Sequence, residues 1–400
     1  MEAVIKTLLK NGFEAYLVGG CVRDALRRIK PKDWDITTNA TPDRISALFN
    51  RITKYGARHG TVGVIFDEKN IVEVTTYRLD GEYTDGRRPD NVLFTEDIIQ
   101  DLARRDFTIN AMAYSRVWGL VDPFGGRKDI KNKIIKCVGS PSARLSEDAL
   151  RMVRAVRFAA VFKYDIHSSV FRAIRETRFK INLVSRERIR DEFFKIITGE
   201  KGIALFSQTG LLSEVLKIIE KELELKLNEN ELIKNNKYAA NYNGDDAERL
   251  ALLVYSSKAG DLAKGLRASN SVIKMARSLG GLLETNARFK EQTELRSALN
   301  KYGLQVTSKY LDIVNFLRDF ENSKNFDWVL EAHKNLEQIK ENGDCFNLNA
   351  LEINGDDLIK AGFRGKEIGA VLNKLLKHVI RFPEDNKKIK LLEIIKNINL

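Results

Sequence analysis

The spacing of apolar and polar residues changes near residue 145. Before that point, short apolar runs rich in β-branched residues predict strands, and after it apolar residues recur at helical spacing. The predicted strands are residues 14–20, 60–66, 71–77 and 133–139. Five of the six prolines lie within the first 141 residues, and proline disrupts helix interiors. The pattern therefore predicts turn-rich α/β structure first and mostly helices afterwards.

One polar segment interrupts the helical part. Residues 228–246, NENELIKNNKYAANYNGDD, predict a polar loop or a domain boundary. The chain of 400 residues is long enough for about two to four domains.

Composition narrows the class of protein. With 43% hydrophobic and 30% charged residues, the chain fits an ordinary globular protein and not a disordered, collagen-like or membrane protein. No apolar run approaches membrane-spanning length, and the first twenty residues do not resemble a signal peptide. Three widely spaced cysteines favour reduced thiols over disulfides or a zinc site. We therefore expect a cytoplasmic protein with no membrane partner.

The formal net charge of +12 is spread along the chain but is densest in one stretch. Residues 141–200 hold 13 basic and 8 acidic side chains. A solvated helix face is the simplest explanation, but a polyanionic partner becomes plausible if this stretch also carries a functional motif.

A candidate phosphate site lies in YLVGGCVRDAL, residues 16–26. Gly19 and Gly20 end a predicted strand and begin a predicted helix, so backbone N–H groups can approach a phosphate there. Arg23 lies near the helix start and adds a charge-assisted contact.

A candidate metal site follows directly. Asp33 and Asp35 flank one residue of the strand-like WDI, which places both carboxylates on the same face. Adjacent carboxylates suit Mg²⁺, which binds oxygen ligands together with substrate phosphates. Glu73, on the predicted strand 71–77, is a candidate third carboxylate. An isolated Asp-x-Asp pair also occurs in solvated turns, but the glycine pair upstream favours the metal site.

Two further segments concentrate charge. RLDGEYTDGRRPD, residues 78–90, has almost no aliphatic side chains, so we expect a mobile loop that ends in a basic pair. LARRDFTINAMAY places Arg104 and Arg105 beside Asp106, where a surface salt bridge is the alternative to a functional contact.

The segment SEDALRMVRAVRFAA predicts a helix that begins near Ser146. One side presents Arg151, Arg154 and Arg157, with Asp148 one turn before them. Four small or apolar residues take the opposite side: Ala149, Val153, Val156 and Ala160. A solvated face usually mixes Lys, Glu and Gln, whereas repeated Arg suits bases and phosphates.

Six motifs then occur in the order and approximate spacing of the class II tRNA nucleotidyltransferases, the CCA-adding enzymes of the polymerase-beta-like superfamily. They are GGCVRD with KDWDI, HGTV (59–62), RRPD, RRDFTINAMA, EDALRMVRAVRF and SRERIRDEFFKI (185–196). Residues 351–376 also resemble the C-terminal region of the bacterial members. The resemblance implies an α/β nucleotidyltransferase head with a mixed sheet (1–140), then an all-α neck (141–200), body (201–330) and tail (331–400).

The resemblance also implies a reaction, the untemplated addition of C, C and A to the tRNA 3′ end from CTP and ATP, with release of pyrophosphate. Side chains must then read the base. Cytosine and adenine each present an amino donor beside an unprotonated ring nitrogen, so a carboxylate and a guanidinium together accept them and mispair with uracil and guanine. Asp148 and Arg151 match the family positions with these roles.

The other implied roles cover the phosphates and the metal. Asp33 and Asp35 match the catalytic carboxylates that hold Mg²⁺. Five more residues match nucleotide contacts: Gly20 and Arg23 at the triphosphate, and Arg105, Arg154 and Arg157 elsewhere on the nucleotide.

Other functions stay open. A partial enzyme would add only the terminal A or only CC. CC-adding relatives tend to have a shortened loop between the carboxylates and the Arg105 motif, whereas the loop at 78–90 is intact here, which favours terminal A addition. Bacterial poly(A) polymerases share the head motifs, but HGTV stands where their basic signature is expected. A tRNA-binding protein without catalysis is disfavoured because Asp33, Asp35, Asp148 and Arg151 are all present. No His is followed by Asp, which argues against an HD phosphohydrolase domain.

The tail offers a candidate tRNA contact. In AGFRGKEIG (361–369), Gly362 and Gly365 bracket a turn before a helix, which leaves Arg364 and Lys366 to meet a phosphate backbone. The alternative is that these glycines only cap helices. The sequence leaves monomer and homodimer open.

Overall fold

The computed structural model describes residues 1–56, 59–67, 70–81, 92–224 and 226–396. It forms two compact units: unit 1 is residues 1–240 with 265–267, and unit 2 is residues 241–264 with 268–400. Of the two predictions for 228–246, the boundary is confirmed, because unit 1 gives way to unit 2 at residues 240–241. The loop is wrong for most of its length, because Glu229–Asn241 form helix α12. Apolar residues at helical spacing, including Leu232 and Tyr238, are buried there and favour the helix. The division into head, neck, body and tail stays a prediction.

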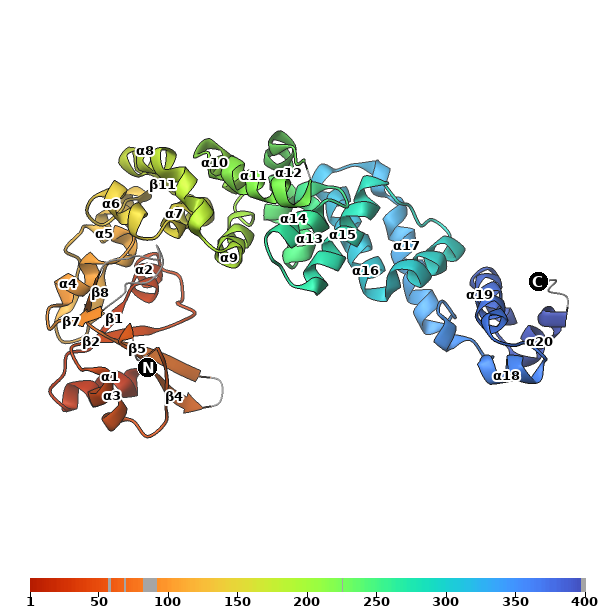
Figure 1. Ribbon diagram of the computed structural model, residues 1–400, viewed down its shortest axis with the longest axis horizontal. Coiled ribbons are helices and arrows are strands. Elements are labelled where there is room, and N and C mark those ends of the chain that lie inside the picture. Colours follow the sequence, from red (N-terminus) through yellow and green to blue (C-terminus); the bar gives the residue numbers. More distant parts are fainter. Residues whose placement is uncertain (57–58, 68–69, 82–91, 225, 397–400) are drawn as a thin grey trace. The chain divides into compact units, whose positions relative to one another are not determined.

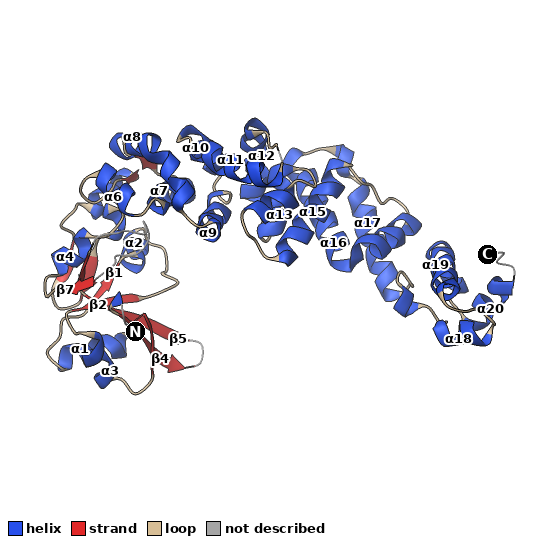
Figure 2. Ribbon diagram, viewed as in Figure 1, coloured by secondary structure: helices blue, strands red, loops and turns tan. Residues whose placement is uncertain are grey.

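A seven-stranded sheet begins unit 1, with the order β3–β4–β5–β2–β1–β8–β9. Figures 1 and 2 label several of its strands, among them β1, β2, β4 and β5. Only β2 and β5 are parallel neighbours, and the other neighbours are antiparallel, so the sheet is mixed. Its strands are β1 (Tyr16–Val18), β2 (Asp35–Thr38), β3 (Ile52–Gly56), β4 (Thr61–Asp67), β5 (Asn70–Thr76), β8 (Ala113–Ser115) and β9 (Gly119–Val121). The predicted mixed α/β head is confirmed.

Two smaller sheets accompany it. β6 (Arg78–Asp80) pairs with β7 (Val92–Phe94). The predicted strand at 133–139 is mostly wrong, because only β10 (Ile134–Ile135) is a strand there, paired in parallel with β11 (Asp165–Ile166). Cys137 forms an isolated bridge with Phe107 instead.

The alternation of side chains along β5 explains why the sheet both packs and carries chemistry. Val72 and Val74 are buried in a core shared with α1 (Glu2–Lys10) and α3 (Pro42–Leu48), whereas Glu73 between them is exposed on the other face. A carboxylate on this strand can therefore serve a site without entering the core.

Helices follow the sheet in unit 1 (Figure 2). The described helices of unit 1, besides α1, α3 and α12, are α2 (Gly20–Leu26), α4 (Ile98–Ala103), α5 (Gly126–Asn132), α6 (Pro141–Glu147), α7 (Leu150–Phe162), α8 (Ser168–Thr177), α9 (Arg186–Ile196), α10 (Gly202–Gln208) and α11 (Leu211–Leu223), with short 3-10 helices at Thr108–Asn110 and Arg178–Leu183. The predicted apolar side of α7 is confirmed, since Val153 and Val156 are fully buried and Ala149 and Ala160 nearly so.

The predicted start of this helix near Ser146 is wrong. Pro141, which favours the first helical position, begins the separate helix α6, and α6 ends at Glu147. Asp148 has extended backbone angles (φ −141°, ψ 106°), and its Oδ1 accepts a hydrogen bond from the Leu150 N–H at 3.0 Å. Asp148 therefore lies in the junction that starts α7 and not within a continuous helix.

Unit 2 contains helices and no strand among its described residues. They are α13 (Asp246–Val254), α14 (Ala259–Gly265, whose last residue belongs to unit 1), α15 (Asn270–Glu284), α16 (Gln292–Glu321), α17 (Trp328–Glu341), α18 (Gly355–Lys360), α19 (Lys366–Arg381) and α20 (Lys388–Lys396). The predicted change from α/β to all-helical structure is confirmed. No single described helix is both long and apolar enough to cross a membrane, and only the bent pair α10 and α11 passes on length and composition together.

Candidate active site

Three carboxylates lie near one another where β2 pairs with β5. Asp35 is the first residue of β2 and lies opposite Glu73 in the parallel register with β5. Asp33 lies in a bend just before β2, so the predicted strand begins later than expected. Burial and the nearby charge of Asp33 raise the pKa of Asp35, against the lowering effect of Arg105. Burial and then Asp35 and Asp33 raise the pKa of Glu73.

These donors fit a divalent cation. Burial is the first cause of the raised pKa values of Asp35 and Glu73, and the neighbouring carboxylate charges add to it; a bound cation would offset both effects. Within the described ranges, no group of three His, Cys, Asp or Glu residues is arranged to hold a metal ion. Two adjacent carboxylates still suit Mg²⁺, because that ion commonly completes its shell with waters and substrate phosphates.

The glycine turn before α2 leaves room for an arginine. Gly19 has φ +72°, and a Cβ on it would lie 3.0 Å from Nη1 of Arg105, so a larger residue would be strained and crowded. Gly20 begins α2, and Arg23 on this helix donates from Nη1 to Oδ1 of Asn110 at 2.6 Å. The predicted phosphate-site residues therefore lie beside Arg105, which acts on Asp35 electrostatically.

The arginines after α4 are half-buried and pair with a fully buried carboxylate, so the surface salt bridge considered for them is wrong. Asp101 has no exposed surface and accepts from Nη2 of Arg104 at 2.7 Å and from Nη2 of Arg105 at 3.3 Å. Asp106 pairs with neither neighbour. Its Oδ2 lies 2.7 Å from Nη2 of Arg154 on α7.

Asp106 is the most strongly perturbed carboxylate of the site. Burial alone would raise its pKa, but the charge of Arg154 and hydrogen bonds from Asn110 and Arg154 lower the pKa to about 2. A second buried carboxylate, Glu192 on α9, forms an ion pair with Arg157, in which Oε2 of Glu192 lies 3.0 Å from Nε of Arg157. Burial lowers the pKa of Arg157 to about 10, which Glu192 partly offsets. Both arginines therefore remain cationic near neutral pH.

Asp148 and Arg151 are close in sequence but bind different partners. Oδ2 of Asp148 accepts from Nη2 of Arg188 at 2.8 Å. Arg151 is 8% exposed and donates from Nη1 to Oε2 of Glu147 at 2.6 Å. The expectation of one helix face presenting a carboxylate and three guanidiniums is therefore corrected, because each of these groups has a protein partner.

Sequence reasoning missed the partners themselves. The relevant residues are Asn110 and Asp101 around α4, Glu147 at the end of α6, and Arg188 and Glu192 on α9. Most of them lie in or beside motifs quoted above, but nothing local shows which charges meet. Arg87 and Arg88 of the predicted loop lie outside the described residues.

The tail residues lie in unit 2. Gly362 and Gly365 have φ of +103° and +55°, as a tight turn requires. Arg364 is exposed but donates from Nη1 to the carbonyls of Ile359 at 2.8 Å and Phe363 at 3.0 Å. Lys366 is exposed at the start of α19. A contact of these residues with tRNA stays a prediction.

The mixed sheet with paired carboxylates and the arginine-bearing helices that follow it each match a known family. Residues 15–136 match the family model for the Poly A polymerase head domain, and residues 163–223 match the model for the probable RNA and SrmB-binding site of polymerase A. Both matches are to parts of poly(A) polymerase-type enzymes, in the order in which the sheet and the helices follow along this chain.

Full-length relatives identify the family. The chain is 33% identical to the CCA-adding enzyme of Geobacillus sp. over 99% of its length and 96% of the relative. It is 34% identical to the CCA-adding enzyme of Limosilactobacillus fermentum over 94% of its length and 91% of the relative. The crystal structure of the Bacillus stearothermophilus CCA-adding enzyme in complex with CTP superposes with a TM-score of 0.79 at 27% identity, covering 99% of this chain and 96% of that one. The chain belongs to the CCA-adding enzymes, a family of tRNA nucleotidyltransferases.

Proposed function

We propose that this enzyme adds C, C and A in turn to the tRNA 3′ end from CTP and ATP, with Asp33 and Asp35 as catalytic carboxylates. The observation that carries the residue assignment is the convergence of Asp33, Asp35 and Glu73 beside Arg105, with raised pKa values at Asp35 and Glu73. Full-length similarity to CCA-adding enzymes supports the reaction itself.

The reaction is an in-line displacement. The tRNA 3′-hydroxyl oxygen forms a bond to the α-phosphorus of the nucleotide, the bond to the bridging oxygen breaks, and pyrophosphate leaves. Mg²⁺ held by Asp33 and Asp35, with Glu73 close by, would stabilise the charge that develops at the phosphate. Arg23 and Arg105 lie at the glycine turn and would neutralise the triphosphate.

Base reading is assigned to Asp148 and Arg151. Asp148 already accepts three hydrogen bonds, from the Leu150 N–H and two nitrogens of Arg188. A carboxylate offers roughly four acceptor positions, so one remains for an exocyclic amine of cytosine or adenine. Arg188 would hold the carboxylate in place for this contact. Arg154 and Arg157 would contact the nucleotide while Asp106 and Glu192 hold them.

The partial-enzyme alternatives are separated by one experiment. Three tRNAs ending at the discriminator base, at C and at CC are each incubated with CTP, ATP or both, and the products are sized. Full CCA addition predicts that all three are completed when both nucleotides are present. Extension of the CC-ending tRNA alone would identify an A-adding enzyme, and a product stopping at CC would identify a CC-adding one. A long A tract would indicate a poly(A) polymerase, and no extension would indicate an inactive binder.

The cytoplasmic location also stays a prediction. Three free cysteines, all buried, support a reducing compartment. The oligomeric state stays open between monomer and homodimer.

A further inference from the structure

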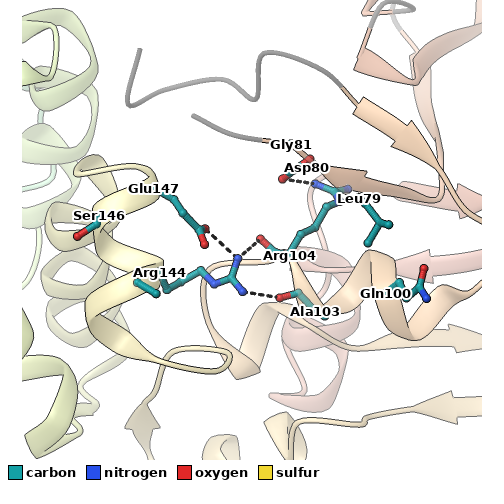
Figure 3. A pocket seen from close by; sticks show the side chains of 10 residues that line it. Leu79, Asp80, Gly81, Gln100, Ala103, Arg104, Arg144, Ser146 and Glu147 are labelled. Atoms are coloured by element: carbon teal, nitrogen blue, oxygen red, sulfur yellow. Dashed lines mark hydrogen bonds and ion pairs between the residues drawn. The ribbon is translucent and has the colours of Figure 1, made fainter. Parts of the chain in front are cut away.

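Arg144 on α6 is not one of the predicted site residues, but it shares a hydrogen-bond acceptor with Arg151, which is one of them. Its side chain forms part of the wall of a cavity of about 550 Å³, together with residues of β6 and α4 (Figure 3). Only 17% of the side chain is exposed, so the guanidinium is largely withdrawn from water. A withdrawn cation needs acceptors, and the surroundings of Arg144 supply four.

Three of these acceptors are backbone carbonyls. Arg144 donates from Nη2 to the carbonyl of Ala103 at 2.8 Å and from Nη1 to that of Arg104 at 3.2 Å, with a longer bond from Nε to the carbonyl of Val138 at 3.4 Å. Ala103 and Arg104 form the C-terminal end of α4, where carbonyls lack helical partners and the helix dipole favours a cation. Arg144 thus fastens α6 to the end of α4.

The fourth acceptor is shared with Arg151. Oε2 of Glu147 accepts from Nη1 of Arg144 at 2.9 Å and from Nη1 of Arg151 at 2.6 Å (Figure 3 draws the first). The carbonyl of Arg104 is also common to both, at 3.5 Å from Nη2 of Arg151. Arg151 further donates to the backbone carbonyl of Arg144 at 3.0 Å. Two of the acceptors that position the Arg151 guanidinium, Oε2 of Glu147 and the carbonyl of Arg104, are therefore also bound by Arg144.

We propose that Arg144 is a positioning residue for nucleotide selection, which acts by fixing Glu147 and, through it, the guanidinium of Arg151. The proposal rests on the base-reading role of Arg151 proposed above. Without Arg144, Glu147 has one cation instead of two, and the end of α6 loses its anchor on α4. Arg151 then moves relative to the base, and displacements of about 1 Å suffice to cost large factors in rate. The metal-binding carboxylates are not part of this network.

The test measures kcat/KM for CTP, ATP, UTP and GTP with the full-length Arg144→Gln variant. We expect the ratio of kcat/KM for CTP over UTP to fall about tenfold, mainly through a higher KM for CTP, with a smaller loss of kcat. Arg144→Lys keeps the charge but not the fork, so it should restore part of the ratio. The matched control is Arg186→Gln, because Arg186 is a half-buried arginine of unit 1 that binds Glu222 and the Gly265 carbonyl. It should lose stability without a change in the ratio.

Coupling gives a second readout. If Arg144 acts through Glu147, the double variant Arg144→Gln with Glu147→Gln should lose little more discrimination than either single variant. Additive losses, or a wild-type ratio in Arg144→Gln, would overturn the proposal. An Arg151→Gln variant shows which proposal has failed when Arg144→Gln keeps the wild-type ratio. If the CTP over UTP ratio is also unchanged in Arg151→Gln, the base-reading role of Arg151 is wrong. If the ratio falls in Arg151→Gln alone, only the positioning role of Arg144 is wrong.

Discussion

At the scale of single residues, the active site is organised by ion pairs between distant parts of the chain. Asp106 and Arg154 are 48 positions apart, and Asp148 and Arg188 are 40 apart. Removing one partner of a buried pair leaves an uncompensated charge, at a cost of about 3–5 kcal/mol. A variant of Asp148 is therefore compared with one that breaks the same pair at Arg188.

Loss of either catalytic carboxylate should abolish chemistry. Asp33→Ala and Asp35→Ala leave Mg²⁺ too few fixed anionic ligands, so addition of both C and A should fall below detection while tRNA binding survives. Rates at controlled Mg²⁺ and tRNA affinity are the measurements. Asp43→Ala, which removes an exposed carboxylate from the first turn of α3, should be active. Substantial turnover by both aspartate variants would contradict the assignment.

Loss of the base-reading acceptor should relax selection. Asp148→Ala removes the acceptor for the exocyclic amine, so discrimination against UTP and GTP should weaken by about tenfold or more while the metal site stays intact. The kcat/KM values for the four nucleotides are compared. Arg188→Gln is the comparison: it breaks the same ion pair but keeps the acceptor itself, so it should relax selection less than Asp148→Ala does. An equal fall for every nucleotide in Asp148→Ala would remove base reading from this residue.

At the scale of elements, buried polar contacts join α2, the loop after α4, α7 and α9. Arg23 binds Asn110, Asn110 binds Asp106, and Asp106 binds Arg154. Nη1 of Arg154 in turn lies 3.7 Å from Oε1 of Glu192 on α9. These contacts connect the proposed triphosphate site to the proposed nucleotide-binding face of α7.

Asp106 should make stability depend on pH in the acid range. Its pKa is about 2 in the folded chain against 3.8 for the ordinary value. A lowered carboxylate pKa stabilises the fold above pH about 4, and this contribution of about 2 kcal/mol is lost as pH falls towards 2. Asp106→Asn should lower the urea midpoint at pH 7 and flatten its decline between pH 4 and 2. Parallel pH curves for variant and wild type would contradict this.

At the scale of the whole molecule, the net charge of +12 exceeds what a nucleotide site requires. Unit 2 carries no part of the proposed catalytic site. Binding the phosphate backbone of tRNA is a function that its basic residues suit. Its tail turn presents two exposed basic residues, although Arg364 also caps the end of α18.

The tail prediction is tested by salt dependence. The double variant Arg364→Ala with Lys366→Ala should weaken tRNA binding and reduce the slope of log affinity against log salt by up to about one unit per lost phosphate contact. ATP affinity should not change. Lys6→Ala with Lys10→Ala removes the same charge from exposed positions on α1 and serves as control. Parallel salt titrations of equal affinity would place the tail's tRNA contact elsewhere.

Much of the fold follows from local pattern. The β-branched run at 71–77 is a strand because alternate residues pack on one face, and the apolar side of α7 is buried as its spacing predicts. The start of α7 does not follow from the apolar spacing. Pro141 starts a separate helix, α6, and the extended backbone at Asp148 then interrupts the helical pattern before α7. The segment at 228–246 shows the reverse, since a few buried apolar residues outweigh its polar composition.

The sequence by itself determined the class of structure, the family and the kinds of side chain at the site, because periodicity and motifs are local properties of the chain. Only the tertiary structure decided which charges meet. The Asp106 carboxylate pairs with Arg154 and not with Arg105, and the Arg151 guanidinium pairs with Glu147 and not with the carboxylate of Asp148. The physical reason is that buried charges need partners at hydrogen-bond distance, and packing of helices far apart in sequence sets those distances.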